Sequence, residues 1–114
     1  MQIRNIPSSL AALAIAAALG FSLKAADPRV EKGRQVYADQ KCALCHSIGD
    51  KGNKKGPLDE VGSKLSSADL HAWIVDAKRM TEKTKAPRKP VMKNYDLPKD
   101  DVDALVAYML TLKK

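Results

Sequence analysis

The chain is poor in aromatic residues and in cysteine. Among its 114 residues there are one phenylalanine, one tryptophan, three tyrosines and two cysteines. Two cysteines exclude a framework of several disulfides, and one small domain of this length buries only a limited core by itself. The sequence also shows no internal repeat and no alternating strand pattern. We therefore expect an all-α domain that needs additional apolar mass to complete its core.

The first 25 residues form a segment of their own. Arg4 precedes an uncharged apolar run of 14 residues that starts at Leu10, and two alanines follow it closely. This pattern predicts a secretory signal peptide over residues 1–25, which leaves residues 26–114 as one domain. A membrane-spanning helix needs about 20 apolar residues, so we expect no membrane span in the mature chain. Lys24, beside the cleavage position, keeps an uncleaved anchor open as the alternative.

One pentapeptide carries a specific chemical signal. Cys42-Ala43-Leu44-Cys45-His46 has the C-x-x-C-H spacing by which c-type haem is attached. On a helical turn each residue advances about 100° around the axis, so the two thiols and the imidazole leave from one face. Two thiols can form thioethers with the two vinyl groups of one porphyrin, while the imidazole binds iron from the same side. The motif predicts one covalently bound haem c, whose apolar mass would complete the core.

Three other interpretations of the pentapeptide have to be weighed. A thiol–disulfide redox motif usually accompanies a βαβ pattern, which the sequence lacks. A structural zinc site needs four well-spaced ligands, but Cys45 and His46 are adjacent and His71 has no partner nearby. A structural disulfide would not require the histidine. Haem is attached to this motif outside the cytoplasm in bacteria, so the signal peptide and the motif support each other.

Three segments predict the main helices. The first runs from about Pro28 to Lys41, after an aspartate in the cap position. The second, from about Ser67 to Lys78, follows a capping-box sequence. The third opens at Pro98 and has a regular apolar stripe. Between them, segments 47–65 and 81–95 contain glycine, proline or both, and these predict loops.

Taken in order, these features resemble one family. The chain is similar to a bacterial class I cytochrome c over residues 28–114, and the order and spacing of short motifs carry the resemblance. Those motifs are Gly33-x-x-x-Tyr37, the C-A-L-C-H sequence, Gly56-Pro57-Leu58, a methionine in a proline-containing loop, and Leu105-Val106-Ala107-Tyr108. The resemblance implies an all-α class I cytochrome c fold, in which three main helices and long loops wrap around one covalently bound haem.

The resemblance also implies roles for single residues. Gly33 would let the first helix approach the last one closely, with Tyr37 packed beside it. The Pro57 carbonyl would accept a hydrogen bond from the Nδ1–H of His46, which fixes the tautomer that binds iron through Nε2. Trp73 would line the haem pocket, a role that is compatible with ordinary core packing.

The second axial ligand of the iron decides what the haem can do. Two strong protein ligands favour electron transfer, whereas an open position lets the iron bind gases or do chemistry. The candidates are Met80, Met92, Met109 and His71. The resemblance implies Met92, in the loop before the last helix, opposite His46. Lys93 follows it where the family often has proline, and Met80 is the main alternative.

The chain is basic, with a net charge of +7. Between Lys78 and Lys93 there are seven lysine or arginine residues and one acid, Glu82. Such a run is most commonly a solvated face, but positive charge near a haem edge would steer an acidic redox partner. Nucleic acid is not expected as a partner, because the chain has no recognisable binding motif and is predicted to be exported.

The combined prediction is an exported, periplasmic electron carrier rather than an enzyme. Cys42 and Cys45 would hold one haem c, His46 and Met92 would bind its iron, and redox proteins would be its partners. The alternative is a haem enzyme or a gas-binding haem protein with a labile or absent sixth ligand. A non-haem thiol or zinc protein is the third reading.

Overall fold

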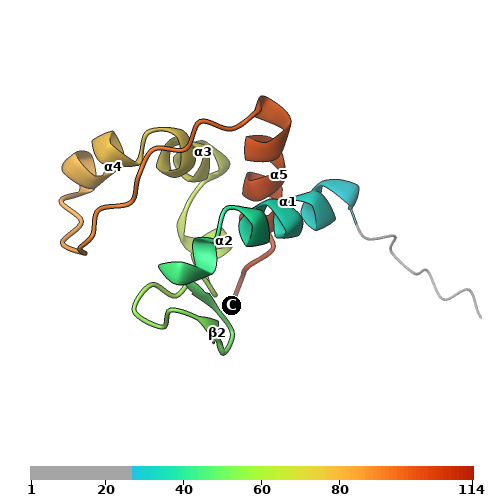
Figure 1. Ribbon diagram of the computed structural model, residues 1–114, viewed down its shortest axis with the longest axis horizontal. Coiled ribbons are helices and arrows are strands. Elements are labelled where there is room, and N and C mark those ends of the chain that lie inside the picture. The colour runs from blue at the N-terminus through green and yellow to red at the C-terminus, as the bar shows by residue number, and fades with distance from the viewer. Residues whose placement is uncertain (1–26) are drawn as a thin grey trace, which may run out of the picture.

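The computed structural model describes residues 27–114, so the predicted signal peptide lies outside the described residues. This part of the chain contains five α-helices, one short 3-10 helix and two short strands, and Figure 1 shows how the helices are arranged. The elements are α1 (Pro28–Asp39), η1 (Cys42–Leu44), β1 (Ser47–Ile48), β2 (Lys51–Gly52), α2 (Val61–Lys64), α3 (Ser67–Val75), α4 (Ala77–Thr84) and α5 (Lys99–Leu110). Over residues 27–114, no helix combines the length and apolar character that crossing a membrane requires.

Local chemistry sets both ends of α1. Asp27 Oδ1 accepts a hydrogen bond from the Arg29 backbone N–H at 2.9 Å, and Pro28 occupies the first turn. At the other end Lys41 adopts a left-handed conformation with φ 56°, which a right-handed helix cannot continue. The helix therefore ends at Asp39, slightly before the predicted end, and the chain turns into η1.

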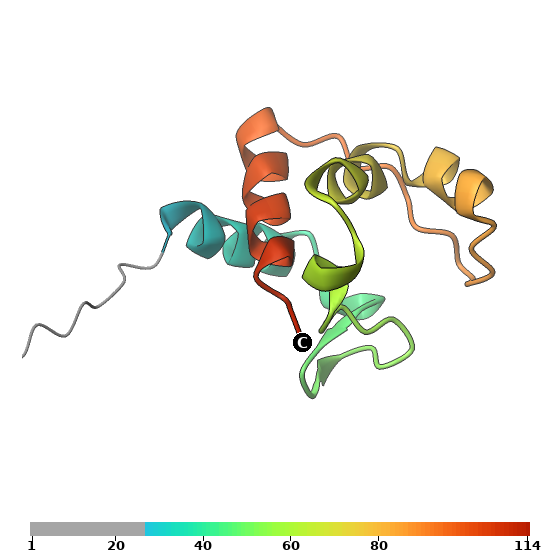
Figure 2. The same cartoon turned by 180° about the vertical axis from the view of Figure 1, so that it is seen from behind.

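Helices α1 and α5 cross at close range, as the two opposite views in Figure 1 and Figure 2 show. A Cβ at Gly33 would overlap the Ala104 carbonyl oxygen and lie 2.7 Å from Tyr108 Cβ, so only glycine permits this approach. Tyr37 and Tyr108 pack edge to face beside the crossing, with ring centroids 5.9 Å apart. The predicted contact between the first and last helices is therefore present.

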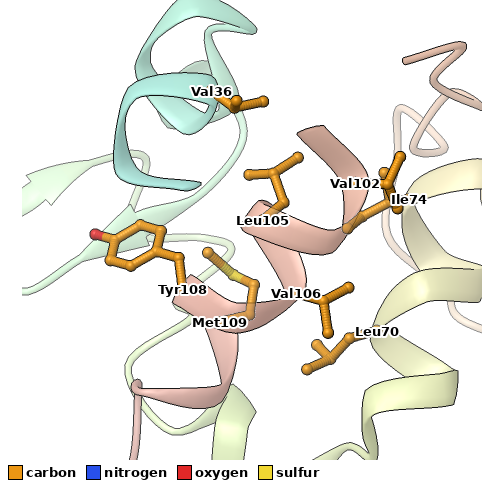
Figure 3. Close-up of a cluster of buried hydrophobic side chains, with 8 residues drawn as sticks. All are labelled: Val36, Leu70, Ile74, Val102, Leu105, Val106, Tyr108 and Met109. Atoms are coloured by element: carbon orange, nitrogen blue, oxygen red, sulfur yellow. The ribbon is translucent and has the colours of Figure 1, made fainter. Parts of the chain in front are cut away.

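The hydrophobic core lies between α1, α3 and α5. Figure 3 shows eight buried side chains that meet there: Val36 from α1, Leu70 and Ile74 from α3, and Val102, Leu105, Val106, Tyr108 and Met109 from α5. The last helix, for which an apolar stripe is predicted, thus supplies five of the eight residues. Helix α3 is capped as its sequence predicts, because Ser66 Oγ accepts a hydrogen bond from the Asp69 backbone N–H at 3.1 Å.

The second predicted helix is divided in two. Helix α3 ends at Val75, because Asp76 leaves the helical conformation at φ −143° and ψ 52°. Helix α4 follows and continues to Thr84, through residues that the sequence predicted as loop. Ala77 and Met80 are the buried residues of α4 and lie on one face of this short, mostly polar helix. The sequence predicted a loop from residue 81 because the segment is basic and contains two prolines.

The expectation of no strand is wrong at one place. Strands β1 and β2 form an antiparallel hairpin after the C-A-L-C-H turn, in which Ser47 pairs with Gly52 and Ile48 with Lys51. Gly49, with φ 62°, provides the tight connection. Strands of two residues are too short to leave an alternating pattern in the sequence. The hairpin and α2 thus give regular structure to segment 47–65, which was predicted as a loop. The fold remains that of an all-α domain.

Candidate functional site

The C-A-L-C-H sequence folds into the helical turn that its spacing predicts. The backbone N–H groups of Cys45 and His46 donate to the Cys42 carbonyl, at 3.1 and 2.9 Å. Both thiols and the imidazole consequently line one cavity. The cysteines are free, with Cys42 half-buried and Cys45 exposed, and burial raises the pKa of the Cys42 thiol. The turn thus presents all three groups to the same space.

The cavity has a volume of about 610 Å³, within the range typical of cofactor sites. Its wall comes from α1, the C-A-L-C-H turn, α2 and the residues beside it, α3, α4, the segment between α4 and α5, and α5 itself. Four of its apolar lining residues also belong to the core cluster: Leu70, Ile74, Leu105 and Met109. An apolar group bound in the cavity would therefore extend the core, which meets the need inferred from the small aromatic content.

His46 is oriented by the loop that packs behind it. Its Nδ1–H donates to the Gly56 carbonyl oxygen at 3.0 Å, which leaves Nε2 for a metal. The expectation that the Pro57 carbonyl accepts this bond is wrong by one residue, and Pro57 itself is exposed. The buried Ser47 fixes the loop, since its N–H donates to Gly56 at 3.1 Å and its carbonyl accepts from Leu58 at 2.8 Å.

Burial lowers the pKa of His46, and this outweighs the opposing effect of its hydrogen bond to Gly56. A lowered pKa favours the neutral imidazole. Metal binding requires that neutral form, because a protonated ring has no lone pair to offer. The surroundings of His46 therefore prepare it to act as a ligand.

Asn53 stabilises the C-A-L-C-H turn through hydrogen bonds, although the sequence analysis did not identify this residue. Its backbone N–H donates to the carbonyls of Ala43 and His46, at 3.1 and 2.9 Å. Its side-chain amide donates to the Leu44 carbonyl at 3.2 Å. These partners are backbone atoms that meet Asn53 only after the hairpin has formed. No side-chain pattern in the sequence could therefore have marked it.

The candidate sixth ligands differ in burial and in whether they line the cavity. Met92 is half-buried and lines the cavity. Met109 also lines it but belongs to the core cluster. Met80 is 4% exposed, on the inner face of α4, and is not part of the cavity wall. His71 is exposed and lies at a separate, smaller hollow. Met92, but not Met80, thus shares a cavity with His46.

Two aromatic residues in the wall bear on what the cavity can hold. Trp73 lines it and is half-buried. Tyr37 also lines it, and its buried hydroxyl has no hydrogen-bond partner among residues 27–114. The cavity has a mostly apolar wall, which suits a large apolar group. It also offers two thiols, an imidazole and a hydroxyl without a partner, which suit a metal and polar substituents on that group. The residues present therefore fit a haem.

Comparison with known proteins agrees with this geometry. A protein named cytochrome c oxidase subunit 2, from Alkalihalophilus pseudofirmus, is 29% identical over 106 residues, which covers 82% of this chain and 30% of that protein. The chain thus spans less than a third of the length of that relative. No solved structure matches the chain. The family model described as Cytochrome c matches residues 30–113. Because this match covers nearly all of the described residues, the chain belongs to the cytochrome c family, whose members carry covalently attached haem c.

Proposed function

We propose that the chain is an exported monohaem electron carrier in which His46 and Met92 bind the iron. The main support is the single cavity that both thiols, His46 and Met92 line. Haem held there through thioethers to Cys42 and Cys45 would supply an iron that takes up and releases one electron. Proteins of this family are in general electron carriers, which is consistent with the proposal.

Each residue of the site has its own task in this proposal. His46, held by the Gly56 carbonyl, offers Nε2 to the iron. Met92 offers a soft thioether sulfur, which stabilises the ferrous state and so raises the reduction potential. If His46 and Met92 both bind the iron, the protein would leave no position for a gas or a substrate. The mostly apolar wall would limit the access of water to a metal held there, and electron transfer would be the chemistry that the site supports.

Exchange of single methionines tests the ligand assignment. In Met92→Ala one axial position opens. We therefore expect the ferric methionine–iron absorption band to disappear, the reduction potential to fall and carbon monoxide to bind the ferrous iron. Met80→Ala is the matched control, because it removes the same side chain outside the cavity wall. It should keep the band while losing about 2–5 kcal/mol of stability, since Met80 is buried.

The same spectra distinguish the alternatives. A band that survives in Met92→Ala but disappears in Met80→Ala would move the ligand to Met80 and leave the electron carrier intact. A wild-type protein that already binds carbon monoxide readily would contradict the carrier function. It would instead support the haem enzyme or gas-binding protein with a labile or absent sixth ligand.

We further propose that the partner is an acidic redox protein. Lys83, Lys85 and Lys89 are exposed and form no ion pair within the described residues. Leu44 and Val91 line the cavity with 72% and 37% of their surface exposed. Apolar contact beside exposed cations suits a charged, transient partner. The name of the relative makes a cytochrome c oxidase the first partner to assay.

Charge reversal tests this docking surface. Changing Lys83, Lys85 and Lys89 together to glutamate should slow electron transfer at low salt and flatten its salt dependence, because steering by exposed charge is screened within about 10 Å at 0.1 M salt. The control changes three exposed lysines near the hairpin to glutamate, namely Lys51, Lys54 and Lys55. Equal rates in the two triple variants would mean that Lys83, Lys85 and Lys89 serve solubility rather than docking.

We also propose that residues 1–25 direct export to the periplasm, leaving residues 26–114 as the mature domain. The support is the charged start and the 14-residue apolar run of the sequence. The mass of the periplasmic protein, measured after acid–acetone extraction, would reveal both the cleavage site and the covalently held haem. A full-length cytoplasmic chain would contradict export, and a chain without the haem increment would contradict attachment.

A further inference from the structure

Helices α3 and α4 are separated by a break whose hydrogen bonds are completed by the segment before α5. In one continuous helix the Lys78 backbone N–H would donate to the Ile74 carbonyl, four residues earlier. Asp76 leaves the helical conformation between them and makes no side-chain capping bond to α4. The Tyr95 N–H instead donates to the Ile74 carbonyl at 2.9 Å. The Lys78 N–H donates to Asn94 Oδ1 at 3.0 Å, so an asparagine from outside the helix caps α4.

These two hydrogen bonds hold the segment that carries Met92. Asn94 comes two residues after Met92, and Met92 and Tyr95 both line the cavity. Lys93, between Met92 and Asn94, does not fix its own backbone torsion as a proline would. Its Nζ lies 4.8 Å from the centroid of the Tyr95 ring, which is a weak contact for an exposed lysine. The position of Met92 therefore depends on the hydrogen bonds that its neighbours make with the break between α3 and α4.

We propose that Asn94 is a positioning residue whose cap on α4 keeps the Met92 segment closed over the cavity. Asn94 is exposed and is not part of the cavity wall, so its side chain acts on Met92 through the bond to Lys78. Opening the segment separates Asn94 from Lys78 and leaves the first turn of α4 without that acceptor. The Asn94 cap thus holds Met92 in place for the iron. This inference rests on the proposed function, in which Met92 is the sixth ligand.

Imidazole binding to the ferric holoprotein measures how readily Met92 leaves the iron, because an added ligand needs the sixth position. Asn94→Ala removes the cap, and loss of one helix cap typically changes such an equilibrium about fivefold. We therefore expect the apparent affinity for imidazole to rise by about that factor, because the open state becomes more populated. Asn94→Asp keeps an oxygen acceptor at this helix end and should have an affinity close to that of the wild type.

Ser66→Ala is the matched control. It removes the side-chain cap of α3, which lies outside the Met92 segment, so it should lower stability without changing the affinity for imidazole. An equal rise in Asn94→Ala and Ser66→Ala would overturn the inference, because affinity would then follow overall stability. An affinity in Asn94→Asp as high as that in Asn94→Ala would also overturn it, because the acceptor is still present.

Amide hydrogen exchange at Tyr95 distinguishes failure of this inference from failure of the ligand assignment. The Tyr95 N–H is bonded to Ile74, so its exchange reports opening of the segment whatever ligand the iron has. In Asn94→Ala this amide should exchange about fivefold faster, and an unchanged rate would overturn the inference. Faster exchange with the wild-type affinity for imidazole would support the Asn94 cap and contradict Met92 as the ligand.

Discussion

The close crossing of α1 and α5 makes Gly33→Ala the most informative stability variant. The new methyl group would overlap the Ala104 carbonyl oxygen, and it would lie 2.7 Å from the Ala104 carbonyl carbon and from Tyr108 Cβ. The first two atoms are backbone, and the third is attached directly to it. None of them can give way as the end of a flexible side chain could. The substitution therefore has to push the two helices apart.

Two opposing free-energy terms set the size of the effect. Alanine is favoured over glycine inside a helix by about 1 kcal/mol, which stabilises the variant. Overpacking costs about 1–3 kcal/mol, and contacts with rigid backbone place this variant at the upper end of that range. We therefore expect Gly33→Ala to lower the free energy of unfolding by about 1–2 kcal/mol. Each kcal/mol corresponds to about 4–8 °C in melting temperature for a domain of this size.

Urea and thermal unfolding of the holoprotein, followed by helical circular dichroism, measure this change. Gln35 is exposed on the same helix, so the difference between Gln35→Ala and Gln35→Gly gives the helix-propensity term alone. Subtracting that term from the Gly33→Ala result isolates the packing cost. A Gly33→Ala protein at least as stable as the wild type would refute the reasoning, because no packing cost would oppose the gain in helix propensity.

Three further predictions concern other parts of the fold. Ser66→Ala removes the cap of α3 and should cost about 1 kcal/mol in urea unfolding, whereas the exposed Ser67, changed to alanine, should cost less. Lys85 follows the end of α4 in a left-handed conformation with φ 54°. Lys85→Gly should therefore leave the free energy of unfolding unchanged or raise it by up to about 1 kcal/mol. Lys83→Gly, within the helix, should lower it. Burial raises the pKa of Tyr37 from 10.0 to about 12, so its contribution to stability is fully present below pH 10 and is lost as the pH rises toward 12. The melting temperature of Tyr37→Phe should lack that part of the pH dependence, and an unchanged profile would contradict this assignment.

The chemistry of the site could be predicted from the sequence because it is local. The two thiols and His46 lie within five consecutive residues, and helical spacing alone brings them to one face. The Ser66 cap and the apolar stripe of α5 are local patterns of the same kind. The order of the motifs along the chain also pointed to Met92, which the structure places in the cavity that His46 lines.

Other features depend on where distant segments meet, and only the tertiary structure decided them. Helix α4 extends into the basic segment predicted as loop, and its buried face consists of two side chains, Ala77 and Met80. Gly56 rather than Pro57 orients His46, because backbone hydrogen bonds from Ser47 and Leu58 set the register of that loop.

The sequence by itself determined the C-A-L-C-H turn, the first and last helices and the basic character of the chain, because these follow from the spacing and charge of neighbouring residues. The tertiary structure decided which carbonyl holds His46, that Met92 and Met109 but not Met80 line the cavity, and which cation, Arg88, is half-buried in its wall. These features depend on the close packing of α1, α3 and α5, because that packing determines where the loops between the helices can lie.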